Sequence, residues 1–265
     1  MRLSDDQLRQ LRDQGFVNAG QPFTAQELAE IGGEYDRLVG FEHQVLGNPD
    51  DGVFPYRAML HFRSPVLRRY VIHPALMELV RQLVGPDVRL WWDQGINKAP
   101  GSGSAIRWHQ DNGYQEGRVP EYVTSWLALD DSDLANGGLL AIPGSHRGGL
   151  LPHAMEGVHA VVEDAASIDE VAAVPLDAHA GDLLVFSSLL VHQTVGNRTR
   201  DRQRRSWVLQ YAPADLRNET TGERYDDREW VLQGGAIVAE PWSERRLDLG
   251  GRARERREGE PATTS

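Results

Sequence analysis

A histidine and a carboxylate two residues apart, His109 and Asp111, form the pair in this sequence with the clearest chemical potential. They follow the β-prone stretch 105–108, and residues i and i+2 of an extended chain project to the same face. We therefore expect both side chains to point at one spot. A His-x-Asp tripeptide by itself is more often a surface turn, so a metal site needs a third partner.

His192 offers that third ligand. It follows the apolar residues 183–191, which we expect to form a strand that ends at His192. Two imidazoles and one carboxylate are the facial arrangement of non-haem Fe(II) oxygenases, which leaves coordination positions open. The sequence contains no cysteine, so a bound metal must be held by nitrogen and oxygen atoms. The pattern predicts a metal site at His109, Asp111 and His192.

A basic segment begins soon after His192, where a hairpin from the His192 strand would return. Alternation along an extended chain puts Arg204 and Ser206 on one face and Arg205 on the other. Arg204 could offer a bidentate guanidinium to a carboxylate beside the Ser206 hydroxyl, which suits a dicarboxylate co-substrate. The neighbouring arginines at 198, 200 and 202 are expected in a solvated turn.

Helices are expected in the first third of the chain. Capping-box signals at residues 4–7 and 24–27 each precede apolar residues at helical spacing. A third helix is expected to start at Pro74, since a first helical position does not need an N–H, and to end at Gly85. These helices must support whatever element carries the candidate site.

Short β-prone segments separated by turn-forming clusters follow residue 85. Many short strands without intervening helices are typical of a barrel or a jelly roll. The expected strands are Val88–Trp92, Ala105–Trp108, Tyr122–Leu129, Leu139–Ile142, Leu183–Val191 and Ser206–Tyr211.

We expect one domain over residues 1–249. Residues 147–174 resemble a long loop, and loops of this length are usually lids, binding loops or disordered. Residues 250–265 are charged and too poor in apolar residues to bury a core, so a disordered tail is expected there. The domain divides into a helical part at 1–85, a β core at 86–215 and a C-terminal extension at 216–249.

The overall charge limits the partners. The 28 lysines and arginines against 39 aspartates and glutamates leave a net charge of −11, the wrong sign for holding nucleic acid or an anionic membrane. The apolar runs are shorter than the ~20 residues of a membrane span, and the first residues lack the pattern of a signal peptide. We expect a soluble, cytoplasmic protein with a small-molecule partner, and the oligomeric state is open.

Five motifs occur in order between Trp91 and His192, and the similarity that they carry covers most of the chain, from Leu3 to about Pro213. They are Trp91-Trp92-Asp93-Gln94 with 97–102, Trp108-His109-Gln110-Asp111, the segment 126–131, the segments 136–138 and 142–146, and Gly181-Asp182 before His192. Together they resemble the phytanoyl-CoA dioxygenase family of Fe(II)/2-oxoglutarate oxygenases.

The resemblance implies a fold that is mainly β, with a double-stranded β-helix core of the jelly-roll or cupin-like kind and the N-terminal helices packed against it. It also implies Fe(II) held by His109, Asp111 and His192, with 2-oxoglutarate and O2 as co-substrates. Arg204 would hold the distal carboxylate of 2-oxoglutarate.

Three further positions acquire a role through the resemblance. Gln94 and Lys98 match positions from which family members approach the co-substrate or the substrate, and Trp126 lies on a strand that lines the same cavity. The span from His192 to the anchoring arginine is one residue longer than in the usual family pattern. Gln203 also stands where a proline often precedes that arginine. Arg205 therefore remains an alternative anchor.

The activity implied is hydroxylation of an unactivated C–H bond with release of succinate and CO2. A secondary metabolite, an amino acid derivative and an acyl compound are all open as substrates. Two other functions compete with this one. The first is a cupin-like, metal-dependent hydrolase or isomerase, in which Arg204 would have no role. The second is a non-catalytic relative that binds a metal or ligand without turnover.

Overall fold

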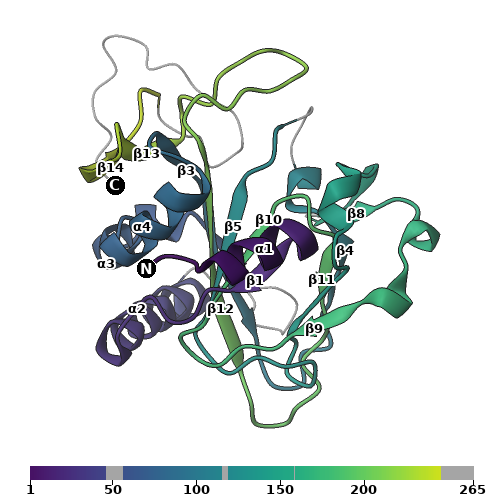
Figure 1. Ribbon diagram of the computed structural model, residues 1–265. Coiled ribbons are helices and arrows are strands. Elements are labelled where there is room, and N and C mark those ends of the chain that lie inside the picture. Colours follow the sequence, from purple (N-terminus) through teal and green to yellow (C-terminus); the bar gives the residue numbers. More distant parts are fainter. Residues whose placement is uncertain (46–55, 115–118, 158, 246–265) are drawn as a thin grey trace.

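Two antiparallel β-sheets lie face to face at the centre of the computed structural model, which describes residues 1–45, 56–114, 119–157 and 159–245. The expectation of a mainly β, jelly-roll architecture is confirmed. Figure 1 shows helices α2, α3 and α4 on one side of the larger sheet and strands β4, β9 and β11 of the smaller sheet on the other. The disordered tail expected at 250–265 lies outside the described residues.

The elements have the following bounds. The helices are α1 (Asp5–Gln14), α2 (Ala25–Gln44), α3 (Pro65–Tyr70) and α4 (Pro74–Leu83), with short 3-10 turns η1 (Leu60–Phe62), η2 (Asp111–Tyr114), η3 (Ser145–Gly148), η4 (Ala165–Ser167) and η5 (Glu170–Ala172). The first strands are β1 (Phe16–Asn18), β2 (Tyr56–Ala58), β3 (Val88–Lys98), β4 (Ile106–His109), β5 (Val123–Ala128), β6 (Leu139–Ala141) and β7 (His153–Glu156). The others are β8 (His159–Val162), β9 (Val174–Leu176), β10 (Leu183–Ser187), β11 (His192–Thr194), β12 (Arg204–Pro213), β13 (Glu229–Gln233) and β14 (Ala236–Trp242).

The major sheet has the order β1-β10-β5-β12-β3-β13-β14, with β2 also paired to β3, and the minor sheet has the order β4-β11-β6-β9. Alternation along the major sheet separates two cores. Leu127 and Trp207 face the helices, whereas Trp126 and Val208 face the minor sheet. The inner face of the major sheet therefore lines the space between the two sheets.

The capping-box signals in the sequence are confirmed at the starts of helices α1 and α2. The Ser4 hydroxyl accepts a hydrogen bond from the Gln7 backbone N–H, and the Gln7 side chain accepts one from the Ser4 N–H. Thr24 and Glu27 form the same reciprocal pair at the start of α2. These capping boxes satisfy N–H groups that a helix start leaves without intrahelical partners.

The strand expected over residues 183–191 is shorter than predicted. Strand β10 ends at Ser187, because the Ser187 side chain accepts from the Leu189 N–H at 3.0 Å and its carbonyl accepts from the Leu190 N–H at 2.9 Å. This serine turn competes with the sheet ladder and redirects the chain. His192 consequently begins a separate strand, β11, in the minor sheet.

The prediction of a hairpin between the His192 strand and the Arg204 strand is also wrong. Strand β11 pairs with β4 and β6, whereas β12 pairs with β3 and β5 in the major sheet. The two strands therefore face each other across the interior instead of lying side by side. This arrangement places Arg204 on the sheet opposite His192.

Residues 147–174, expected as a loop, contain the hairpin β7–β8 and the turns η4 and η5. The ion pair between Arg107 and Glu156 and the hydrogen bond from the Gln110 N–H to His153 Nε2 at 3.1 Å attach the hairpin to the segment that carries His109. Among the described helices, none is long and apolar enough to cross a membrane.

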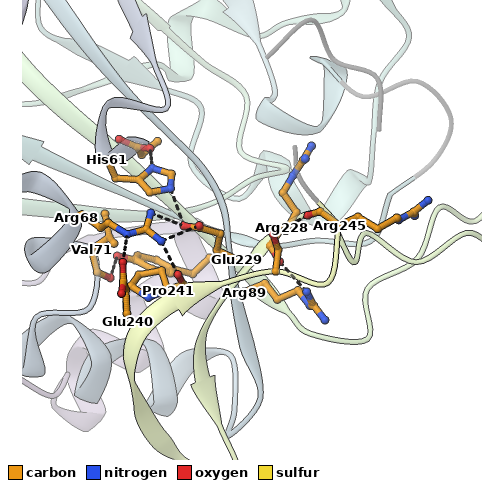
Figure 2. A network of polar contacts seen from close by, with 12 residues as sticks. His61, Arg68, Val71, Arg89, Arg228, Glu229, Glu240, Pro241 and Arg245 are labelled. Atoms are coloured by element: carbon orange, nitrogen blue, oxygen red, sulfur yellow. Dashed lines mark hydrogen bonds and ion pairs between the residues drawn. The ribbon is translucent and has the colours of Figure 1, made fainter. Parts of the chain in front are cut away.

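The C-terminal extension adds β13 and β14 to the edge of the major sheet, and buried charges attach it to the helical side (Figure 2). The His61 ring contacts Asp93 through Nδ1 and Glu229 through Nε2, the latter at 2.9 Å. Arg68 donates to both Glu229 oxygens at 2.9 and 3.1 Å and to the Pro241 carbonyl. We refer to His61, Asp93, Glu229 and Arg68 as the outer network.

Candidate active site

Two histidines and one aspartate converge between the sheets. His109 ends β4, Asp111 begins η2, and His192 begins β11, directly opposite His109 in the ladder. One potential ligand atom from each of the three lies within 4.8 Å of the others. Asp111 Oδ1 is 3.8 Å from Nε2 of each histidine, and all three residues are buried. The structure therefore brings together the three residues that the sequence selected.

Backbone carbonyls hold both imidazole rings in the orientation that metal binding requires. His109 Nδ1 donates to the Arg107 carbonyl at 2.8 Å, and His192 Nδ1 donates to the Leu190 carbonyl at 2.9 Å. A carbonyl only accepts, so each ring carries a proton on Nδ1, and Nε2 is the nitrogen left to bind a metal. Burial, reinforced by the neighbouring His192, lowers the pKa of His109 well below its usual value.

Asp111 presents its two oxygens to different partners. Oδ1 faces the imidazoles, whereas Oδ2 accepts a hydrogen bond from the Thr124 hydroxyl. The backbone after Asp111 is anchored by the bond from the Asn112 N–H to the Ser188 carbonyl at 3.1 Å. Two oriented imidazole nitrogens and one carboxylate oxygen fit a divalent transition metal.

A buried arginine lies on the sheet opposite His192. Arg204 is fully buried, and its Nη1 donates to Ser206 Oγ at 2.8 Å, so the two residues share one face as alternation predicts. Within the described ranges of the chain, Arg204 Nε and Nη2 have no hydrogen-bond partner, nor does the buried Trp126 Nε1. The guanidinium lies 5.6 Å from the centre of the Trp126 ring. This group of buried donors fits an acceptor-rich anion.

Lys98 is the direct cross-strand neighbour of Arg204. Its ammonium donates to Thr194 Oγ1 at 2.8 Å, to the Ser104 carbonyl at 3.1 Å and to the Val195 carbonyl. Burial lowers the pKa of Lys98 to about 6, and the nearby Arg204 cation acts in the same direction. These three contacts occupy the Lys98 nitrogen, so Lys98 offers no free N–H to a ligand.

Gln94 lies four residues before Lys98 on β3, and its Oε1 accepts from Trp92 Nε1 at 3.1 Å. Arg205, the alternative anchor, points to the helical side. It forms ion pairs with Asp130 at 2.6 Å and with Asp36 of α2 at 2.8 Å. Among the residues that the structure describes, Arg204, and not Arg205, therefore has unpartnered donors in the interior.

Three residues near the candidate site were not selected from the sequence. Thr124 and Gln210 lie on the inner face, and the Tyr114 ring meets the His109 ring edge to face at 5.7 Å between centres. The available signal for Thr124 was its position two residues before Trp126 on an expected strand, which places both on one face. Face assignment alone does not reveal a contact with Asp111.

A jelly-roll core with this donor set and a buried arginine characterises the 2-oxoglutarate-dependent non-haem iron dioxygenases. The sequence profile of the family described as "Phytanoyl-CoA dioxygenase (PhyH)" matches residues 11–206. The chain belongs to that family.

Individual relatives agree with this placement. The phytanoyl-CoA dioxygenase 1 of Oryza sativa subsp. japonica is 28% identical over 214 residues, which is 74% of this chain and 75% of the relative. Two other phytanoyl-CoA dioxygenases, from Caenorhabditis elegans and Homo sapiens, are matched over about half of their own length.

Solved structures of two related enzymes superimpose on most of the chain. The apo structure of the non-heme monooxygenase ThoJ has a TM-score of 0.70 at 26% identity and covers 92% of this chain and 90% of its own. The non-heme alpha ketoglutarate dependent epimerase SnoN from nogalamycin biosynthesis has a TM-score of 0.66 at 27% identity, with 94% and 96% covered.

Proposed function

We propose that this protein is a hydroxylase that uses Fe(II), 2-oxoglutarate and O2 to oxidise an unactivated C–H bond of a small molecule, with release of succinate and CO2. One observation carries the proposal. Three convergent metal-ligand atoms lie on the minor-sheet side of the interior, and the major sheet carries a buried arginine with two nitrogens that have no partner in the part of the chain that the structure describes.

His109, Asp111 and His192 would hold the iron through the two Nε2 atoms and Asp111 Oδ1. When bound, iron together with 2-oxoglutarate and O2 supplies the oxidising power for the C–H bond. The protein contributes orientation, because both rings are fixed through Nδ1 by backbone carbonyls. It also contributes exclusion of water, since all three side chains are buried.

Arg204 would bind the distal carboxylate of 2-oxoglutarate. Its pKa is lowered to about 10 by burial, so the guanidinium stays charged at neutral pH. The Ser206 hydroxyl orients it, the Trp126 ring lies beside it, and the unpartnered Trp126 Nε1 is a further donor for the co-substrate. Lys98 is the cross-strand neighbour of Arg204, and Gln94 would contact the co-substrate or the substrate from the same strand as Lys98.

Oxygen insertion is favoured over metal-dependent hydrolysis because a hydrolase has no use for the buried Arg204, whose Nε and Nη2 have no partner among the described residues. The similarity to ThoJ, which is described as a monooxygenase, supports the same reaction class. A small organic molecule is the substrate class that we propose. The net charge of −11 gives no support to a coenzyme A ester.

An anaerobic Fe(II) titration by calorimetry tests the metal assignment. Replacing His109, Asp111 or His192 by Ala should abolish stoichiometric Fe(II) binding, while circular dichroism shows a folded protein. His146→Ala is the matched control, because His146 Nε2 contacts the Arg12 carbonyl and His146 is not a member of the metal-ligand group. Unchanged iron affinity in the Asp111→Ala protein would refute the assignment.

A further inference from the structure

We infer that Thr124 and Gln210 form a positioning relay that keeps Asp111 bound to the metal through a single oxygen. The inference rests on the proposed iron site and adds to it the control of the carboxylate's binding mode. Thr124 lies on β5, Gln210 lies on β12, and neither belongs to the metal-ligand set.

The contacts form a chain across three elements. Thr124 and Gln210 are direct cross-strand partners in the major sheet. Gln210 Nε2 lies 3.4 Å from Thr124 Oγ1, and the Thr124 hydroxyl contacts Asp111 Oδ2. Thr124 is fully buried and Gln210 is nearly so. Solvent therefore does not compete for this part of the carboxylate.

The chemistry of the three groups fixes the direction of the chain. The Gln210 NH2 group only donates, so the Thr124 oxygen accepts from it. The Thr124 hydroxyl has one proton, and an ionised Asp111 carboxylate only accepts, so that proton is donated to Oδ2. Donation by Gln210 polarises the Thr124 hydroxyl and strengthens its bond to the carboxylate.

The consequence concerns how many metal positions Asp111 occupies. Oδ1 lies 3.8 Å from both imidazole Nε2 atoms, whereas Oδ2 is engaged by Thr124. A carboxylate whose second oxygen is released can chelate with both oxygens, as carboxylates do at other metal sites. Chelation by Asp111 would take a position that a bidentate keto acid needs.

Thr124→Val tests the relay because valine has the same shape but no hydroxyl. Partners of metal ligands typically contribute 10- to 100-fold to metal affinity, so we expect the Kd for Fe(II) to rise by about tenfold or more. We also expect weaker binding of 2-oxoglutarate to the iron-loaded variant. Co(II) substitution supplies an independent readout, because its visible spectrum reports a change in coordination number.

Thr124→Ser should restore the Fe(II) affinity and the Co(II) spectrum, since serine keeps the hydroxyl. Gln210→Met should produce a smaller shift in the same direction, and it tests the relay if the valine variant fails to fold. Ser125→Ala is the matched control. Ser125 is the next residue on β5, its hydroxyl has no partner in the described structure, and its cross-strand neighbours Val185 and Leu209 belong to the helix-side core.

An Fe(II) affinity and a Co(II) spectrum of Thr124→Val within twofold of wild type would overturn the relay. So would a serine variant that behaves like the valine variant. Failure of the iron site itself gives a different result, because wild type and the Asp111→Ala protein would then bind Fe(II) equally.

Discussion

Two polar clusters lie on opposite faces of the major sheet, and they differ in how their charges are paired. On the helix side, the outer network matches its charges: Asp93 contacts His61 and Trp207, and Glu229 contacts His61 and Arg68. On the inner face, two nitrogens of Arg204 have no partner among the described residues. The same sheet thus carries a paired cluster on one face and an incompletely paired one on the other.

This difference separates stabilising charges from charges that serve binding. A buried charge costs several kcal/mol unless it is paired, so the outer network stabilises the fold only as a complete set. Arg204 bears that cost in the free protein, and an anionic ligand would offset it. Ligand binding should therefore stabilise the inner cluster and leave the outer network unchanged.

The largest expected effect is on stability. Asp93→Ala leaves the His61 ring without one of its two carboxylates, and breaking a buried pair typically costs about 3–5 kcal/mol. The loss should appear as a lower free energy of unfolding in urea, with unchanged 2-oxoglutarate affinity of the folded protein. Glu240→Ala is the control, because this other partner of Arg68 has a side chain that is 77% exposed. A loss below about 1 kcal/mol in Asp93→Ala, the size typical of surface pairs, would mean that the outer network is not stabilising.

The next effect is on binding. Arg204→Ala removes a charge-assisted contact to a desolvated carboxylate, which typically costs about 2–5 kcal/mol, so the Kd for 2-oxoglutarate should rise at least about tenfold. Arg205→Ala should change this Kd much less, because Arg205 is occupied by Asp130 and Asp36. Calorimetry on the iron-loaded proteins measures both values. A larger rise of this Kd in Arg205→Ala than in Arg204→Ala would show that Arg205 is the anchor.

The outer network also predicts a pH dependence of stability. Burial alone would lower the pKa of His61, but Asp93 and Glu229 outweigh it and raise the pKa to about 9, from 6.5 in the unfolded chain. A group whose pKa is raised by folding stabilises the protein below its unfolded pKa and loses this contribution as pH rises through the folded value. The advantage of wild type over His61→Gln in urea denaturation should therefore be full below pH 6.5 and shrink towards pH 9. An advantage that grows over this interval would show that His61 is not held as a cation.

The smallest effect is expected for Ser206→Ala. The Ser206 hydroxyl accepts from Arg204 Nη1, and a hydrogen bond of this kind contributes on the order of 0.5–1.5 kcal/mol. The Kd for 2-oxoglutarate should rise about two- to tenfold, less than in Arg204→Ala. A larger effect than that of Arg204→Ala would make the hydroxyl, and not the guanidinium, the main contact.

Local signals in the sequence predict much of this arrangement. The capping boxes at residues 4–7 and 24–27 place two helix starts, because a cap depends on side chains three residues apart. Strand alternation places Arg204 and Ser206 on one face, because residues two apart in a strand project to the same side. The His-x-Asp pair and His192 could be selected by residue type, and the fold brings them together.

Contacts that depend on distant segments could not be predicted in this way. The turn at Ser187, which moves His192 to the other sheet, comes from a side-chain bond that competes with a strand-like sequence. His61 and Glu229 are 168 residues apart in the chain, and only the completed major sheet makes them neighbours. The Thr124–Asp111 bond likewise requires the two sheets to meet at a defined distance.

The visible spectrum of the anaerobic protein with Fe(II) and 2-oxoglutarate tests the central assignment most directly. Iron chelated by a 2-keto acid shows a metal-to-ligand charge-transfer band that a zinc hydrolase or a site without keto-acid chelation cannot produce. We predict a visible band in wild type, its absence in the His109→Ala, Asp111→Ala and His192→Ala proteins, and a higher 2-oxoglutarate requirement in Arg204→Ala. If iron and 2-oxoglutarate are both bound to wild type and no band forms, the oxygenase site described above is contradicted.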